Sequence, residues 1–362
     1  MRVILRFRFG FFLLLYAASV ALTSCSHERA MDPCCVFSEL ATQANITDGY
    51  GALQVEGSTS SYYYVYDQNG DQAGYASLNK VVALAPGRYS VKVNNSSHEV
   101  EVRAGELGKC STGTLILNGN TSDYYIVTDS SGVQLGYESL GKSMSFFPGP
   151  VRVKVNNTEL SADVKLKELT EIRTGSISVK GNTGEYYYVL DHENKQLNYN
   201  SLEKPLAFLP GRYVVKINNT SMTADVKPGA VTELATGNVV VKGLTEEYYY
   251  VTDTAGNALN YQTLNKSLAF FPGSYEIKVN NTLMYGKVSA GETAEFMTGS
   301  LMLTGGGTSY YYVLDHLGNQ LNYNSLNKSL SFFPSEYTIK IGPNMRKATV
   351  TAGQLTSLSA FN

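Results

Sequence analysis

A string of tyrosines recurs along the chain, and it is the pattern whose residue types best suit recognition chemistry. Residues 246–253 read EEYYYVTD. If this string is a strand, alternation places Tyr249 and Val251 on the core face and the flanking tyrosines on the opposite face. The outward rings are the candidate binding residues, namely Tyr62, Tyr64, Tyr124, Tyr186, Tyr188, Tyr248, Tyr250, Tyr310 and Tyr312. One expected ring is missing, because Ile126 occupies its position.

Two interpretations account for outward rings of this kind. In the first, they pair across strands with tyrosines such as Tyr75 and Tyr261 and cover the sheet, because aromatic pairs stabilise sheets beyond the area they bury. In the second, exposed rings form a stacking surface for sugar rings or for a partner protein. The absence of tryptophan weakens the sugar interpretation. Sheet cover is therefore favoured at this point.

The N-terminal residues predict export and lipid attachment. Basic residues from Arg2 to Arg8 precede an apolar run that ends in Leu22-Thr23-Ser24-Cys25. That run is short for a membrane span and typical of a signal peptide. The last four residues resemble a bacterial lipobox, in which the cysteine thiol receives a diacylglyceryl group. We expect residues 1–24 to be a lipoprotein signal peptide and Cys25 to carry the lipid.

An aspartate followed three residues later by glycine, as in Asp253-Thr254-Ala255-Gly256, suggests either a calcium loop or a turn. Calcium requires six to eight oxygen ligands, and most copies supply a single carboxylate. A turn with aspartate at its first position and glycine at its fourth explains the copies better. No metal site is expected.

Catalysis finds little support in the sequence. The chain has four histidines, and His192 and His316 stand in turns where other copies carry Gln, Ser or Thr. No nucleophile, base and orienting residue recur together. We expect a protein that is not an enzyme and needs no cofactor.

Three cysteines besides Cys25 leave their pairing open. Cys34 and Cys35 are adjacent, and Cys110 lies far along the chain. An exported protein meets an oxidising compartment, so a disulfide from Cys110 to one of the pair is compatible with the sequence and leaves one thiol over. Residues matching Cys110 elsewhere are apolar, namely Ile172, Leu234, Phe296 and Leu358. This match favours Cys110 as a small core residue.

An internal period of 62 residues organises the chain, because Thr112-Gly113, Thr174-Gly175, Thr236-Gly237 and Thr298-Gly299 are evenly spaced. We call the five units module 1 (50–111), module 2 (112–173), module 3 (174–235), module 4 (236–297) and module 5 (298–362). Residues 25–49 are expected to be a lipidated tether. Modules follow one another without a linker, and small neighbouring modules are expected to pack in an elongated array.

Each module reads as short strands. In module 4, Tyr275, Ile277 and Val279 alternate with polar residues, so one face is expected to be core and Lys278 to face water. Asn280-Asn281 then predicts a tight hairpin turn. With 27 tyrosines and few histidines, the composition favours an all-β fold of five tandem β-sandwiches.

The turn and strand order of each module resembles the PEGA family of small surface-associated β-sandwich modules, with which transthyretin-like modules share these positions. The likeness is carried by segments such as FFPGSYEIKVNN and VSAGE. The chain lacks the Pro-Glu-Gly-Ala stretch and inserts the tyrosine strand. The resemblance implies a β-sandwich fold and a cell-envelope setting, with no ligand specified.

These observations predict a bacterial cell-envelope lipoprotein, anchored in a membrane, most simply the outer membrane, and acting as a stalk or adhesion-type repeat protein. The alternative is a multivalent array that binds an envelope polysaccharide or another surface protein through the tyrosines. A net charge of −2 favours no nucleic-acid partner.

Overall fold

The computed structural model describes residues 33–39, 46 and 48–360, and within these ranges all regular secondary structure is β-strand. The strands up to the end of module 1 are β1 (Cys35–Glu39), β2 (Gly51–Glu56), β3 (Tyr62–Tyr66), β4 (Gln72–Ser77), β5 (Val81–Leu84), β6 (Gly87–Val93), β7 (Ser96–Val102) and β8 (Glu106–Ser111). Those of module 2 are β9 (Gly113–Asn118), β10 (Tyr124–Thr128), β11 (Gln134–Ser139), β12 (Ser143–Phe146), β13 (Gly149–Val155), β14 (Thr158–Val164) and β15 (Leu169–Arg173).

The later modules repeat this order. Module 3 contains β16 (Gly175–Lys180), β17 (Tyr186–Leu190), β18 (Gln196–Ser201), β19 (Leu206–Phe208), β20 (Gly211–Ile217), β21 (Thr220–Val226) and β22 (Val231–Ala235). Module 4 contains β23 (Gly237–Lys242), β24 (Tyr248–Asp253), β25 (Ala258–Thr263), β26 (Ser267–Phe270), β27 (Gly273–Val279), β28 (Thr282–Val288) and β29 (Thr293–Met297). Module 5 contains β30 (Gly299–Thr304), β31 (Tyr310–Leu314), β32 (Gln320–Ser325), β33 (Ser329–Phe332), β34 (Ser335–Ile341), β35 (Asn344–Val350) and β36 (Leu355–Ser359).

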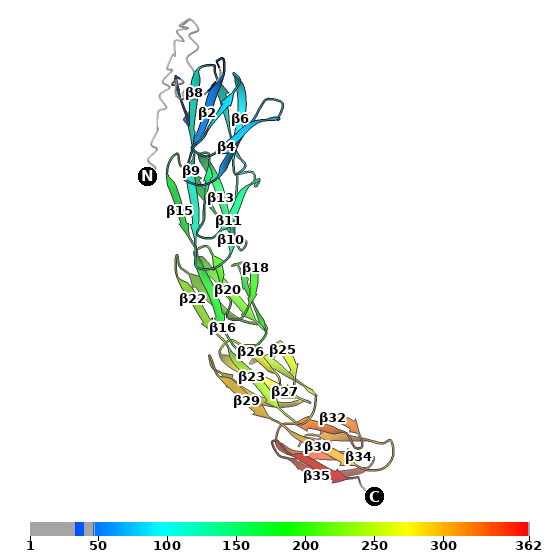
Figure 1. Ribbon diagram of the computed structural model, residues 1–362. Helices are drawn as coiled ribbons and strands as arrows, with labels where there is room; N and C mark the ends of the chain where they lie inside the picture. The colour runs from blue at the N-terminus through cyan, green and yellow to red at the C-terminus, as the bar shows by residue number, and fades with distance from the viewer. Residues whose placement is uncertain (1–32, 40–45, 47, 361–362) are drawn as a thin grey trace, which may run out of the picture. The chain divides into compact units, whose positions relative to one another are not determined.

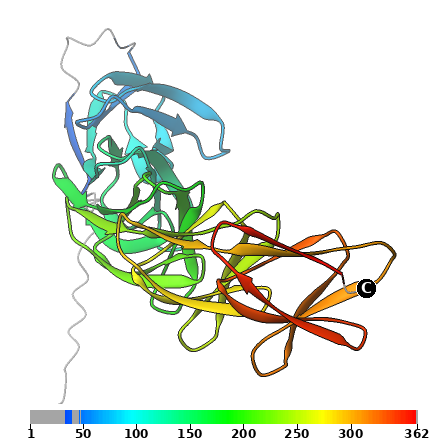
Figure 2. The ribbon, with the colours of Figure 1, turned by 90° about the horizontal axis from the view of Figure 1, so that it is seen from below.

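Module 4 illustrates the topology of the unit. A three-stranded sheet has the order β26-β23-β29, in which β23 pairs antiparallel with β26 and parallel with β29. A four-stranded antiparallel sheet has the order β25-β24-β27-β28. Every sheet takes its strands from one stretch of the chain, so its strands share one part of the colour range in Figure 1 and Figure 2.

The core of each module lies between its two sheets. In module 4, Val239 and Val241 of β23 belong to one buried cluster with Tyr249 and Val251 of β24. In β24 the buried positions alternate with exposed ones, as the two-residue period of a half-buried strand requires. In β23 the intervening residue Val240 is buried as well, so both faces of that strand are covered. The all-β fold of tandem sandwich-like modules is confirmed.

The repeated Thr-Gly pair forms the joint between modules. Only Thr236 separates β22 from β23, and its hydroxyl donates to the Lys180 carbonyl at 3.0 Å. A Cβ on Gly237 would stand 2.0 Å from the Ser289 carbonyl oxygen, so this close backbone approach requires glycine. The pair joins two strands without a linker for two reasons. Thr236 hydrogen-bonds to the preceding module, and Gly237 has no side chain to collide with the backbone of its own module.

The predicted hairpin turn is confirmed at the asparagine pairs. Asn280 and Asn281 have φ values of 44° and 65°, which match a turn with two left-handed central residues. The same positive φ values occur at Asn94-Asn95, Asn156-Asn157 and Asn218-Asn219. Asparagine is tolerated there because its short amide side chain suits the left-handed region.

The segment before module 1 differs from the expectation. Residues 25–49 were predicted to be a tether, yet β1 pairs antiparallel with β8 and adds a fourth strand to the sheet β1-β8-β2-β5. A disulfide joins Cys35 to Cys110, which is fully buried. Cys110 thus lies in the core, as the sequence favoured. The prediction that it is only a core residue was wrong, and the disulfide that the sequence left open is formed, because strand pairing places Cys35 directly opposite Cys110.

Candidate functional site

The tyrosine strand occupies the middle of its sheet and presents alternate rings to its two faces. In module 4, β24 lies between β25 and β27. Tyr249 is fully buried, whereas Tyr248 and Tyr250 are 49% and 48% exposed. The predicted face assignment is confirmed in every module by the buried tyrosines Tyr63, Tyr125, Tyr187, Tyr249 and Tyr311.

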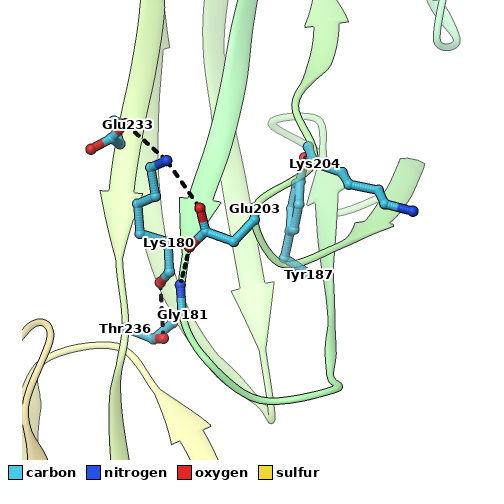
Figure 3. Close-up of polar contacts among 7 residues, drawn as sticks. All are labelled: Lys180, Gly181, Tyr187, Glu203, Lys204, Glu233 and Thr236. Atoms are coloured by element: carbon cyan, nitrogen blue, oxygen red, sulfur yellow. Dashed lines mark hydrogen bonds and ion pairs between the residues drawn. The ribbon is translucent and has the colours of Figure 1, made fainter.

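The inward tyrosine ties the two sheets together. The Tyr249 hydroxyl donates to the Lys266 carbonyl at 2.8 Å and lies 3.1 Å from the Val239 carbonyl of the opposite sheet. Burial raises the pKa of this phenol, so it stays a neutral donor. The equivalent Tyr187 hydroxyl donates to the Lys204 carbonyl at 2.7 Å. Figure 3 shows the Tyr187 ring directed toward Lys204. These inward rings are structural.

The outward rings gather around a tyrosine of the neighbouring strand. Tyr250 stands opposite Tyr261 in the ladder, with ring centroids 5.6 Å apart, and Tyr248 meets Tyr261 at 5.7 Å. The predicted cross-strand pairing of the outward rings with tyrosines such as Tyr75 and Tyr261 is thus confirmed, although this third ring was not among the candidate binding residues. The third rings are Tyr75, Tyr137, Tyr199, Tyr261 and Tyr323, all of them exposed.

All nine predicted binding tyrosines lie on the outer face of their sheets, and we call this surface the tyrosine face. Eight are exposed, and Tyr312 is half-buried. In module 2 the cluster loses one member, because Ile126 stands opposite Tyr137. The rings cover the sheet in pairs and still present open surface, so the geometry satisfies both interpretations of the sequence.

A lysine extends each row of rings across the sheet. Tyr250 stands opposite Tyr261 on one side and opposite Lys278 on the other. The same position is filled by Lys92, Lys154, Lys216 and Lys340. Within the described part of the chain none of these lysines forms an ion pair. Each row thus ends in a lysine that has no ion-pair partner among the described residues.

The asparagine turn of each of the first four modules binds the module that follows. Asn280 donates to the Ser331 carbonyl at 2.9 Å, and Asn281 donates to the Leu321 carbonyl at 2.7 Å. The equivalent bonds join Asn94 to Ser145, Asn95 to Gln134, Asn156 to Ala207, Asn157 to Leu197, Asn218 to Ala269 and Asn219 to Leu259. These amides therefore fix both the turn and the junction.

An apolar residue of the following module completes each junction. Phe333 of module 5 belongs to the buried core cluster of module 4, and its amide donates to the Thr282 hydroxyl at 3.3 Å. Phe147, Leu209 and Phe271 lie in the same way in the cores of modules 1, 2 and 3. Sequence patterns did not reveal this contact, because such a residue reads as core of its own module.

Grooves lie where the tyrosine face meets a junction. One of about 750 Å³ is lined by residues of modules 3, 4 and 5, including Tyr250, Tyr261, Lys278, Asn281 and Asn322. A second, of about 540 Å³, is lined by Tyr62, Tyr64, Tyr66, Lys92, Asn94, Asn95 and four residues of module 2 among others. A third, of about 410 Å³, is lined by Tyr188, Leu190, Gln196, Lys216, Asn218, Asn219, Leu259 and Asn260.

The three junction grooves share one chemistry. Each combines tyrosine, one lysine and asparagine amides, and none of the three linings contains a carboxylate. Lys92 in the second groove has its Nζ 5.1 Å from the Tyr66 ring centroid, a cation–π distance. Such sites suit binding by stacking, hydrogen bonding and positive charge.

The aspartate motif forms the predicted turn. One Asp253 carboxylate oxygen accepts from the backbone amides of Ala255 at 3.0 Å and Asn257 at 2.8 Å. Hydrogen bonds from the Asn257 side chain and from these amides lower the pKa of Asp253. The carboxylate is thus occupied in shaping the loop, as at Asp67, Asp129, Asp191 and Asp315.

Three charged side chains of module 3 form ion pairs with one another on the surface. Lys180 pairs with Glu203 at 3.0 Å and with Glu233 at 3.7 Å (Figure 3). Glu203 also accepts from the Gly181 amide at 2.9 Å, and this bond lowers the pKa of the carboxyl. Among described residues, no group of three or more histidine, cysteine, aspartate or glutamate side chains is placed to hold a metal.

The predicted signal peptide and the lipidation site Cys25 lie outside the described residues. For the part of the chain that is described, no helix is long and apolar enough to span a membrane.

Comparison with known proteins gives no family. No family model and no curated protein matches the chain. Among solved structures, the TIE protein of Bacillus anthracis is 13% identical, with 74% of this chain and 75% of that chain covered and a TM-score of 0.16. BcpA, the major pilin subunit of Bacillus cereus, is 10% identical over 86% and 98%, with a TM-score of 0.14. The pilus adhesin SpaC of Lactobacillus rhamnosus GG is 9% identical over 86% and 43%, with a TM-score of 0.16.

Proposed function

We propose that this protein is a non-enzymatic lipoprotein of the bacterial cell envelope that acts as a stalk. Its PEGA-like or transthyretin-like kinship and its place in the outer membrane are parts of this proposal. The observation that carries it is the repeated junction, in which two asparagine amides and one apolar side chain connect each module to the next. The same kind of junction occurs between modules 1 and 2, 2 and 3, and 3 and 4, which suits a spacer of fixed length.

The physical argument rests on how these contacts restrict movement. A hydrogen bond from Asn281 and one from Asn280 reach separate strands of module 5, at Leu321 and Ser331. The buried Phe333 adds apolar contact between the same two modules. Several bonds at separate points oppose both bending and twisting, whereas a flexible linker opposes neither. Modules joined in this way suit a spacer that holds a distal part away from its attachment point.

The lipid anchor is tested by replacing Cys25 with serine. Wild-type protein should fractionate with membranes and carry an acyl mass at Cys25, because several acyl chains make a stable anchor. Cys25→Ser should appear in the soluble fraction. A variant that stays with the membrane, beside a wild type without acyl mass, would contradict the anchor.

The stalk itself is tested by deleting module 3, residues 174–235, from the full-length protein. The deletion keeps the 62-residue phase, so Asn156 and Asn157 should bind Ala269 and Leu259 in place of their usual partners. A fluorophore at the C-terminus should then lie closer to the membrane by roughly 27 Å, the diameter expected for 62 residues. Axial fluorescence localisation measures this height. An unchanged height would rule out the stalk while leaving the anchor intact.

A further inference from the structure

We propose that the junction grooves bind an acidic polysaccharide, with tyrosine rings stacking on its sugars and lysines pairing with its carboxylates. This binding activity goes beyond the stalk and does not depend on the lipid anchor. The starting observation is the shared lining of the three grooves, which pairs aromatic rings with a lysine and excludes carboxylates.

The charge pattern selects an anionic ligand. The whole chain has a net charge of −2, so a general attraction to polyanions is absent. The grooves differ from this average because Lys92, Lys216 and Lys278 each line one without an ion-pair partner among the described residues. A positive charge of this kind pairs with a carboxylate on a ligand, and the pairing strengthens when a groove reduces solvent access.

The tyrosines select a sugar over an extended peptide. A bound peptide commonly adds a strand to a sheet edge through backbone hydrogen bonds. The tyrosine strand β24 offers no such edge, because both sides already pair with β25 and β27. A ligand on this face must therefore be read by side chains. The open faces of Tyr250 and Tyr261 suit stacking on the C–H surface of a pyranose ring. The side-chain oxygen of Asn281, which accepts no hydrogen bond from the described residues, suits a sugar hydroxyl.

The repeat of the groove selects a polymer. Equivalent rows of tyrosine and lysine recur every 62 residues, and grooves form at the junctions of modules 1 and 2, 3 and 4, and 4 and 5. Weak contacts on one repeating ligand multiply through effective concentration. A chain of uronic-acid sugars supplies rings and carboxylates at regular intervals, so it matches all three features.

Module 2 is a natural control within the chain. Its row contains Lys154 and Tyr137 but has Ile126 where the other modules carry tyrosine. Isoleucine is thus compatible with the fold at this position. Replacing the equivalent tyrosines by isoleucine should remove stacking without disturbing the sheet, and Ile126→Tyr should complete a further row.

The test measures binding of full-length protein, held in mild detergent on a sensor surface, to three polymers of similar length. Polygalacturonate is the acidic sugar, dextran the neutral sugar and polyglutamate the acidic polymer without sugar rings. We expect binding to polygalacturonate alone, weakening as salt is raised. No binding to polygalacturonate overturns the proposal. Equal binding to dextran shows that charge plays no part, and equal binding to polyglutamate shows that the rings play none, and either result also overturns it.

Variants locate the binding to the grooves. The triple variant Lys92→Gln, Lys216→Gln, Lys278→Gln and the triple variant Tyr64→Ile, Tyr188→Ile, Tyr250→Ile should each weaken polygalacturonate binding by about tenfold or more, since multivalent contacts compound. The matched control Lys142→Gln, Lys227→Gln, Lys287→Gln removes the same charge from exposed positions outside the grooves and should change affinity by less than about twofold. Ile126→Tyr should tighten binding. Equal losses in the groove and control triples would show that the grooves are not the site.

Discussion

Module 1 carries a strand that module 4 lacks, although the two share one sheet order. In module 1, β1 lies along β8 and is fixed by the disulfide between Cys35 and Cys110. In module 4 the equivalent strand β29 is the last strand of its sheet. A strand at the edge of a sheet has backbone groups open to pairing, and in module 1 the added strand pairs with β8 and becomes the edge itself. The repeat thus has a distinct N-terminal member.

The same two modules differ in the residue that reaches into a preceding core. Phe271 of module 4 is 2% exposed and lies in the core of module 3. The matching position in module 1 is Ala85, which is exposed. Each of modules 1 to 4 is completed by the next one along the chain, so stability is shared across junctions. The core of a module therefore does not coincide with one 62-residue repeat, because it also contains a residue of the next repeat.

The largest expected effect concerns the core that the two modules have in common. Val65 and Val251 are both fully buried at matching positions. Val251→Asp places an unpaired carboxylate in an apolar interior and should cost about 5 kcal/mol of unfolding free energy, enough to unfold module 4. Val65→Asp should do the same in module 1, which urea unfolding followed by near-ultraviolet circular dichroism would detect.

Lys278→Glu is the control for stability, because it changes charge on the outer face of the neighbouring strand and should cost less than about 1 kcal/mol. If Val65→Asp were tolerated while Val251→Asp unfolds its module, the disulfide would dominate the stability of module 1. The two modules would then differ in what stabilises them, with the disulfide dominant in module 1 and the apolar core dominant in module 4.

The second prediction separates module 1 from the others by reduction. The disulfide closes a loop with a sequence separation of 75, so its loss should lower the stability of module 1 by roughly 4 kcal/mol. Pulling the chain from its N-terminal side should show one additional unfolding step after reduction, releasing roughly 250 Å of chain. Single-molecule force measurements with and without dithiothreitol provide the test. An identical number of unfolding steps with and without dithiothreitol would show that the disulfide does not hold module 1 closed under force.

The third prediction addresses the shared junctions. Phe271→Ala removes a buried ring and should cost about 3 kcal/mol. Because the ring lies in the core of module 3, hydrogen exchange should speed up in β17 and β20 as well as in module 4. Ala85→Gly, the matching position in module 1, should leave exchange in the other modules unchanged. Exchange confined to module 4 would show that the modules are energetically independent.

The sequence predicted the fold of single modules and missed what joins them. The 62-residue period and the alternation around Val251 gave the strands and their faces, because both signals are local. The junction bonds of Asn281 reach a carbonyl 40 residues away, and nothing in the turn sequence specifies that acceptor. Cys110 was assigned from its apolar counterparts, a reasoning that fails where one module differs from the rest.

The candidate site was predictable only in part for the same reason. Alternation identified outward rings such as Tyr250, since it depends on neighbouring residues alone. The sequence also named Tyr261 as a cross-strand partner of these rings, and the ring contacts confirm it. Lys278 joins the row only through strand register, which links residues separated along the chain. The grooves depend on the junctions between modules and were beyond any pattern within one repeat.

The smallest expected effect tests whether the first outward ring of each module covers the sheet. Tyr186, Tyr248 and Tyr310 each meet one tyrosine of the neighbouring strand at a centroid distance of 5.7 or 5.8 Å. Replacing the three by serine should lower stability by about 1 kcal/mol in each module, because an aromatic pair is lost and half of each ring was already exposed. Thermal melting of the triple variant measures this. The inward tyrosines stay in place, so a loss far above this value would mean that the outward rings are part of the core. A melting curve like that of wild type would mean that sheet cover contributes nothing at these positions, and selection for a binding surface would then be the better explanation of the repeated tyrosines.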